Sequence, residues 1–122
     1  MRTLQLYATG SATGTSVAQV TIPVATRLKA LQISMQINSI TDDAQVRIEL
    51  SKVPTNQIGT NGALDPFFEC GIYSNFVTSG LFQNALVNFY PLDTEARQGE
   101  IVYLHATIAG TAVYFFNGIL WY

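Results

Sequence analysis

Apolar and polar residues alternate along most of this chain, which is the pattern of strands that bury one face. The clearest stretch is residues 27–38, where Leu31, Ile33, Met35 and Ile37 share one face and polar residues occupy the other. Helical spacing is never sustained, so we expect a protein built of strands. The expected strands cover residues 2–8, 16–22, 27–38, 44–53, 67–73, 81–90, 101–108 and 112–121.

Eight short strands separated by turns predict an all-β fold, namely an eight-stranded antiparallel β-sandwich of the jelly-roll type. No linker or internal repeat interrupts residues 1–122, so we expect one domain, and this length buries a core without metals or disulfides. An immunoglobulin-like sandwich has less support. Cys70 is the only cysteine, and the only tryptophan, Trp121, is the penultimate residue rather than a core residue of the third strand.

Two polar stretches are expected to be loops. Residues 54–66 contain two glycines and two prolines, with Asn61 followed by a glycine as a strong turn signal, and loops of this length are often functional. Residues 91–100 form a second polar stretch, in which Gly99 is placed for a tight turn into the next strand. The segment 81–86 is also compatible with one or two helical turns, so the start of the sixth strand is left open.

The composition limits the possible partners. Only 11% of the residues are charged, and 35 Ser, Thr, Asn and Gln residues take the place of charges. Such a neutral surface costs little to desolvate against a partner. The six cations are scattered, which excludes the concentrated phosphate contacts of a nucleic-acid binder. No stretch is apolar enough to span a membrane and no N-terminal export signal is visible, so we expect no membrane partner and synthesis in the cytoplasm.

The sequence offers little for catalysis. His105, the only histidine, alternates with Tyr103 and Thr107, and neither a serine elbow nor a Cys–His pair accompanies it, so a structural role is favoured over a catalytic one. One histidine and Cys70 are too few ligands for zinc, and a buried, inert thiol is the favoured reading of Cys70. We therefore expect no enzyme activity, no metal site and no cofactor.

Aromatic residues are concentrated at the C-terminus, where five of the 14 in the chain fall within the last nine residues. Their alternation makes the strand 112–121 apolar on both faces, whereas one face of an antiparallel sandwich is normally wet. A strand covered on both sides within the domain and a strand that packs on a neighbouring subunit are both possible, and we favour the second. The candidate interface with another subunit or another protein is Tyr114, Phe115, Phe116, Trp121 and Tyr122.

These features together resemble the head decoration, or cement, proteins of tailed bacteriophages, which have a viral jelly-roll fold. The resemblance rests on the eight strands, the neutral surface, the short N-terminus and the segment 98–105, which is similar to the turn that enters a late strand of viral jelly rolls. It implies a structural virion protein on the outer capsid surface. Such a protein binds the major capsid protein lattice, forms a dimer or trimer and stabilises the capsid by bridging coat subunits.

Two other functions remain as alternatives. Jelly rolls also serve lectins, so the chain could be a carbohydrate- or receptor-binding module of a phage fibre or lectin type. A cupin or glycosidase is a third possibility. The single histidine weighs against a cupin, and a sandwich of 122 residues has no room for the deep cleft across which the two carboxylates of a glycosidase face each other. For the carbohydrate-binding alternative, the candidate binding loop is Asn56, Gln57, Asn61, Phe67 and Phe68.

Overall fold

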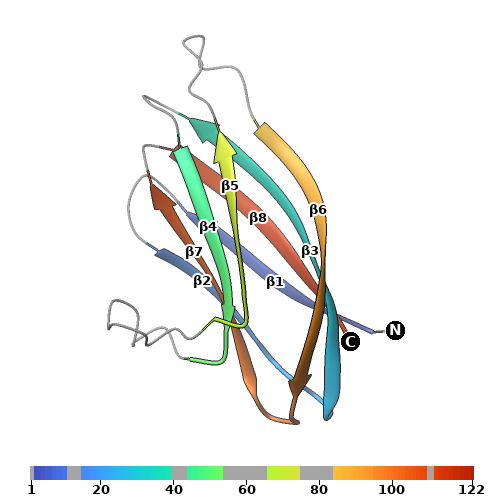
Figure 1. Ribbon diagram of the computed structural model, residues 1–122. Coiled ribbons are helices and arrows are strands. Elements are labelled where there is room, and N and C mark those ends of the chain that lie inside the picture. Colours follow the sequence, from blue (N-terminus) through green and yellow to red (C-terminus); the bar gives the residue numbers. More distant parts are fainter. Residues whose placement is uncertain (1, 11–14, 40–43, 54–65, 75–83, 110–111) are drawn as a thin grey trace.

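The computed structural model describes residues 2–10, 15–39, 44–53, 66–74, 84–109 and 112–122, and these contain eight strands and no helix (Figure 1). None of the described segments is a helix of the length and hydropathy that a bilayer crossing needs. The strands are β1 (Thr3–Gly10), β2 (Thr15–Thr21), β3 (Thr26–Ser39), β4 (Ala44–Ser51), β5 (Phe68–Ser74), β6 (Asn84–Ala96), β7 (Ile101–Ala109) and β8 (Ala112–Trp121).

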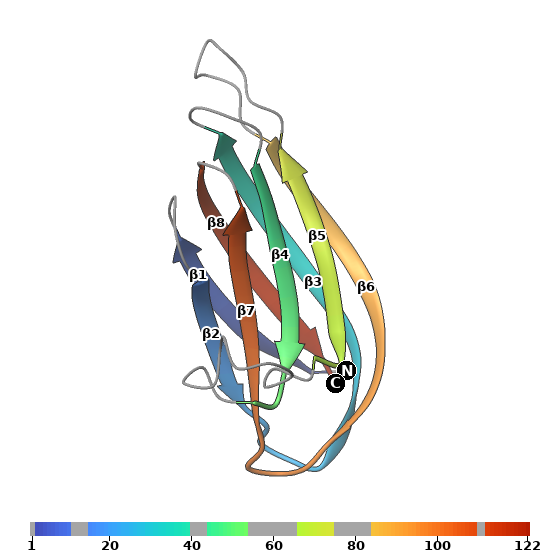
Figure 2. The same cartoon turned by 60° about the vertical axis from the view of Figure 1, so that its left-hand side comes forward.

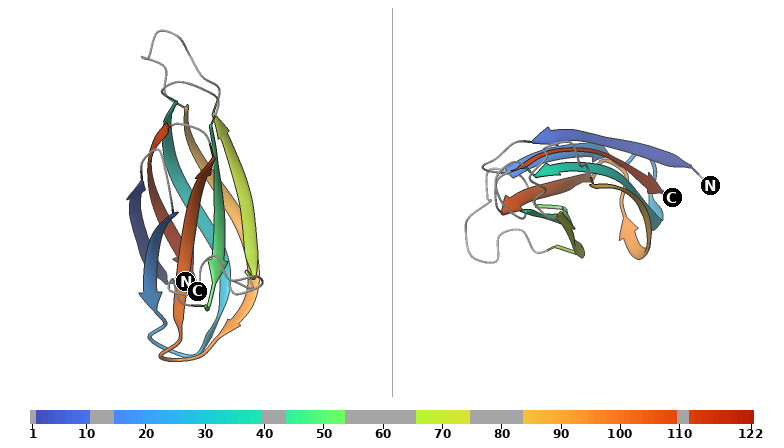
Figure 3. Two further views of the ribbon diagram at one scale, coloured as in Figure 1. Left: turned by 90° about the vertical axis from the view of Figure 1, so that its left-hand side faces the viewer. Right: turned by 90° about the horizontal axis from the view of Figure 1, so that it is seen from above.

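The strands form two antiparallel four-stranded sheets, with the orders β1-β8-β3-β6 and β2-β7-β4-β5. The chain crosses from one sheet to the other at almost every connection, and β4 and β5 are the one pair of consecutive strands that are neighbours in a sheet. The view from above shows the two sheets as stacked, curved layers (Figure 3). This strand order is that of a jelly roll, so the expected fold class is confirmed.

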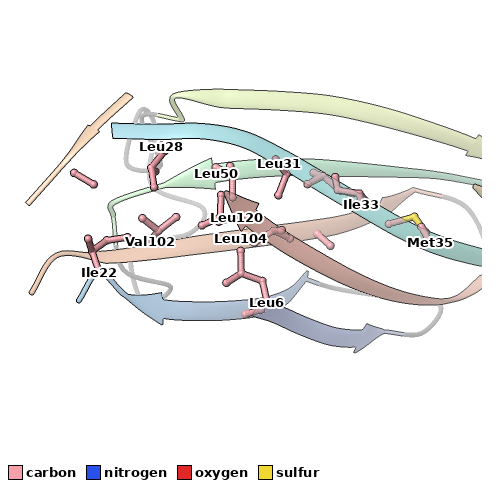
Figure 4. Close-up of a cluster of buried hydrophobic side chains, with 14 of the residues drawn as sticks. Leu6, Ile22, Leu28, Leu31, Ile33, Met35, Leu50, Val102, Leu104 and Leu120 are labelled. Atoms are coloured by element: carbon pink, nitrogen blue, oxygen red, sulfur yellow. The ribbon is translucent and has the colours of Figure 1, made fainter. Parts of the chain in front are cut away.

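The core lies between the two sheets, where the alternating apolar positions meet (Figure 4). Leu31 in β3 is opposite Leu120 in β8 and Tyr90 in β6, and the two leucines are fully buried. Leu50 and Leu104 face them from the other sheet and are also fully buried. The inward-facing half of each strand therefore supplies the fold, and the outward-facing half is available for other contacts.

The expectation of a polar loop over residues 91–100 is wrong for its first six residues, because β6 continues to Ala96. Pro91 fits within β6 because this strand is at the edge of its sheet and pairs only with β3. Arg27 in β3 also stabilises this extension of β6, because its guanidinium donates hydrogen bonds to Asp93 at 2.5 Å and to Glu95 at 3.1 Å. The charged residues that look like a loop in the sequence are thus a cross-strand ion-pair cluster.

The remaining differences lie at the ends of elements. The helical alternative for residues 81–86 is wrong for 84–86, which belong to β6, and 81–83 lie outside the described residues. Gly99 has a φ of 86° and its N–H bonds the carbonyl of Ile22 at 2.8 Å, which confirms the expected tight turn into β7. Figure 2 shows this connection from β6 to β7 at the end of the molecule where β2 is also connected to β3.

Candidate functional site

The outer face of the β1-β8-β3-β6 sheet carries the strongest candidate site. Because cross-strand partners point to the same side of a sheet, the register fixes which residues lie opposite the core. No described strand lies over this side of the sheet (Figure 3). We call its three central rows the Phe89–Trp121 face; Arg27, Asp93 and Glu95 lie outward at one end of it. The described residues of the three rows are Thr3, Gln5, Ala30, Gln32, Ser34, Phe89, Pro91, Asn117, Ile119 and Trp121.

Two aromatic rings dominate this face. Phe89 in β6 is 60% exposed, the larger of the two values among the exposed large hydrophobic residues in the described part of the chain. Trp121 in β8 reaches toward it across the intervening strand β3, and the ring centroids are 6.2 Å apart with the planes tilted by 57°. The two rings therefore form one continuous aromatic surface that spans three strands.

Ala30 explains how the rings can meet. It lies in β3 between Trp121 on one side and Pro91 on the other, and it is only 4% exposed although its Cβ points away from the core. Its larger neighbours must therefore cover it. A longer side chain at this position would stand where the indole crosses the strand, so the small residue shapes the aromatic surface.

Neutral polar residues border the rings. One row across the sheet reads Gln5, Ile119, Gln32 and Phe89 from β1 to β6. Each glutamine amide supplies two donors and an acceptor, so the row alternates apolar contact with hydrogen-bonding capacity. The neighbouring row adds an amide and a hydroxyl from Asn117 and Ser34, both half-buried.

The indole N–H of Trp121 is an unsatisfied hydrogen-bond donor among the described residues. Its Nε1 is buried and has no hydrogen-bond partner in the described part of the chain. A buried donor without an acceptor costs about 1–3 kcal/mol. A partner that moved the ring slightly and offered an oxygen acceptor would recover that free energy.

The outer face of the other sheet contains a buried polar cluster around His105. His105 in β7 is opposite Glu49 in β4 and is 1% exposed, while Glu49 and the neighbouring Tyr103 are each 8% exposed. The Tyr103 and His105 rings stack at 6.1 Å between centroids, and Arg47 bonds Glu49 at 3.0 Å. These three outward-facing side chains are thus buried in a polar cluster.

His105 is a structural residue in this arrangement. Neither ring nitrogen has a hydrogen bond of normal geometry within the described chain. Burial lowers the pKa of His105 below its ordinary value, and the Val53 backbone and the Glu49 carboxylate oppose that shift more weakly. At 1% exposure the ring is out of reach of a substrate in this conformation.

This burial predicts a pH dependence of stability. The folded chain resists protonation of His105, whereas the unfolded chain takes up the proton near pH 6.5, so the free energy of unfolding should fall as the pH drops through 6.5. Urea denaturation at pH 8, 7, 6 and 5.5 measures the effect, and H105Q should flatten this part of the profile. A wild-type profile that is flat over this range, or identical in H105Q, would contradict the assignment.

The structure separates the residues that the sequence grouped at the C-terminus. Trp121 lies on the Phe89–Trp121 face, whereas Tyr122 packs against the core cluster. Tyr114, Phe115 and Phe116 belong to β8, where the backbone register places Phe116 opposite Met35 and Phe115 opposite Gln36, so successive positions alternate between the faces as expected. Their side chains lie outside the described part.

The candidate loop is also divided. Asn56, Gln57 and Asn61 lie outside the described residues. Phe67 and Phe68 are half-buried against the core, and the Phe68 ring contacts that of Tyr90 at 5.1 Å between centroids. These two phenylalanines thus help to close the sandwich between β5 and β6, and they present less free ring surface than Phe89.

Cys70 lies in β5 and packs partly against the core cluster. Burial raises the pKa of its thiol, and a hydrogen bond with Tyr90 opposes the shift. A thiol held in the protonated form is a poor nucleophile and a poor metal ligand. Among the described residues, no group of three or more His, Cys, Asp or Glu side chains is placed to hold a metal ion.

Sequence reasoning missed Phe89 and the polar residues around it. The signal was present in Phe89 and Tyr90, because adjacent residues of a strand point to opposite faces and one of the two rings must therefore leave the core. Which ring leaves, and which residue it meets, depends on the register against β3. The sequence of one strand does not predict its register against another strand.

Comparison with known proteins supports the fold. No family model matches the chain, and no curated protein matches it in sequence. One similar solved structure is the isomalto-dextranase of Arthrobacter globiformis T6 complexed with panose, with a TM-score of 0.51 and 9% identity over 93% of this chain. This chain spans only 18% of that protein's length. Another is the C-terminal CBM6 of LamC, a marine laminarinase from Zobellia galactanivorans, with a TM-score of 0.46, 12% identity, and coverage of 97% of this chain and 98% of that chain.

Proposed function

We propose that this chain is a carbohydrate-binding β-sandwich module that binds a glycan through the Phe89–Trp121 face and catalyses no reaction. The observation that carries the proposal is the 60% exposed Phe89 ring in contact with Trp121 on a sheet face that no described strand covers. Leaving this much ring surface in water is unfavourable, and a ligand that covered it would recover the loss.

Sugar chemistry suits this surface. A pyranose ring has apolar C–H faces that stack on aromatic rings, and a rim of hydroxyl groups that both donate and accept hydrogen bonds. The rings of Phe89 and Trp121 fit the first requirement. The amides of Gln5, Gln32 and Asn117 fit the second, because an amide can donate to one hydroxyl and accept from the next.

The structural comparisons contribute the choice of probe. At 9% identity the likeness to the isomalto-dextranase concerns the fold, and the activity belongs to that whole enzyme, of which this chain spans 18%. Dextran is nevertheless a sensible first ligand, with laminarin as the second. We therefore test glycan binding directly and infer no substrate from the likeness.

Trp121 makes the test simple, since it is the only tryptophan in the chain and lies in the proposed site. Titration with dextran or laminarin should produce a saturable change in its fluorescence, and calorimetry should give the same dissociation constant. A glycan array extends the search to other sugars. The absence of binding on the array, with no fluorescence change and no heat from either glucan, would contradict the proposal.

The second candidate function is that of a structural virion protein, a decoration protein that bridges coat subunits on the outer capsid surface. The same face favours it, because exposed aromatic and amide side chains with little charge also suit a protein contact. This candidate predicts a stable dimer or trimer, or binding to a major capsid protein lattice, that F89A weakens. Sedimentation velocity at micromolar concentration distinguishes it from the proposal, which requires no oligomer.

A further inference from the structure

The two rows that carry Phe89 and Trp121 are uncharged at every position that the structure describes. The row of Thr3, Trp121, Ala30 and Pro91 and the row of Gln5, Ile119, Gln32 and Phe89 contain hydroxyl, amide and apolar groups. A ligand that crossed the sheet along these rows would meet hydrogen-bonding and stacking groups and no full charge.

One of the two cations at one end of this face, Arg27, is already paired, and the other, Lys29, is exposed. Arg27 bonds Asp93 at 2.5 Å and Glu95 at 3.1 Å, and both carboxylate side chains are highly exposed, at 80% and 82%. Lys29 lies in the β-bulge beside them, so two cations and two carboxylates sum to zero. A guanidinium holds an anionic sugar best when it is free to donate two parallel hydrogen bonds. Arg27 already donates its hydrogen bonds to Asp93 and Glu95 in the neighbouring strand.

Resting on the proposed function, we infer that the glycan is neutral and that this face discriminates against uronic acid, sulfated and sialylated chains. An acidic group brought to the aromatic rows would lose hydration, and the residues of these rows supply no cation in exchange. Neutral hydroxyl groups are free of this cost.

Gln32 is the position at which the selectivity for neutral glycans can be tested. It is in β3, in register with Ile119 on one side and with Phe89 on the other, so a ligand on the rings also reaches its amide. A lysine at this position would place one unpaired cation among the aromatic residues. Q32K should therefore favour acidic glycans over neutral ones.

The experiment compares dextran with carboxymethyl-dextran of matched length by calorimetry in 20 mM salt, with laminarin and its carboxymethylated form as a second pair. We expect each carboxymethylated chain to bind at least about tenfold more weakly than its neutral partner, and the ratio to shrink at 300 mM salt through screening. Q32K should lower the ratio. Q19K makes the same change at an exposed position in β2, on the other sheet, and should leave it unchanged.

Two outcomes would overturn the inference in distinguishable ways. Equal or tighter binding of the carboxymethylated chains would refute neutral selectivity and leave glycan binding itself in place. A ratio that Q32K and Q19K change equally would also refute it, because the selectivity would then come from net charge and not from this face. Failure of both members of both pairs, together with an array without hits, would remove the proposed function and the inference with it.

Discussion

Replacement of Phe89 by alanine is expected to weaken glycan binding at least tenfold, about 1.4 kcal/mol, while the chain stays folded. The ring is 60% exposed, so its removal takes little from the core. In the complex the same ring would be covered, and buried aromatic residues near the centre of a contact carry a large share of its free energy. Calorimetry is the right measurement, because the loss of the contact with Trp121 would itself alter the fluorescence of the free protein.

Val24 offers the matched control. It is the other exposed large hydrophobic residue in the described part of the chain, at 43%, and it lies between β2 and β3, outside the rows of the Phe89–Trp121 face. V24A should bind glycan as the wild type does. Unchanged binding in F89A, or an equal loss in both variants, would move the site away from this face.

The sequence was sufficient for the fold because alternation reports directly on burial. Leu31, Ile33 and Met35 were predicted to share one face, and all three are buried between the sheets. The alternation of β6 beyond Tyr90 was hidden by Pro91 and by the charged residues that follow it. Those residues are acceptable in a strand only because β6 is an edge strand and Arg27 in β3 pairs with them, and both facts depend on the register.

The site was only partly predictable for the same reason. Trp121 was singled out from the concentration of aromatic residues, yet its partner Phe89 lies 32 positions earlier in the chain and was not. The two rings meet because β3 runs between β8 and β6 with the small residue Ala30 at the crossing point. A single sequence shows each ring on its own strand, but not that a third strand brings them together.

The two outer faces differ for a physical reason that composition does not reveal. Both carry alternating polar residues in the sequence, but on one sheet His105, Glu49 and Tyr103 are buried, while on the other Phe89 stays exposed. An ion pair and a ring contact hold the buried cluster together, since Arg47 bonds Glu49 and Tyr103 stacks on His105. Among the described residues, the exposed aromatic surface therefore lies on the β1-β8-β3-β6 sheet, which is the face that we propose for glycan binding.

We expect L120A to show the opposite effect to F89A: it should lose stability and keep its affinity for the glycan. The side chain is fully buried and lies opposite Leu4 and Leu31 on the inner face of its sheet. Removing it leaves a cavity, which costs about 2–5 kcal/mol of unfolding free energy. That is a large part of the stability of a domain of this size, about 5–15 kcal/mol.

The pleat explains why affinity should survive this loss. Leu120 and Trp121 are neighbours in β8 but point to opposite sides of the sheet, so folded L120A still presents the aromatic surface. Urea denaturation measures the stability and calorimetry at low temperature measures the binding, with L120M as the volume-conserving control that should lose less than about 1.5 kcal/mol. A loss in L120A below about 1 kcal/mol would contradict its place in the core. A tenfold loss of affinity in the folded variant would show that the two faces of β8 are coupled, so that the core does not merely carry the binding face but shapes it.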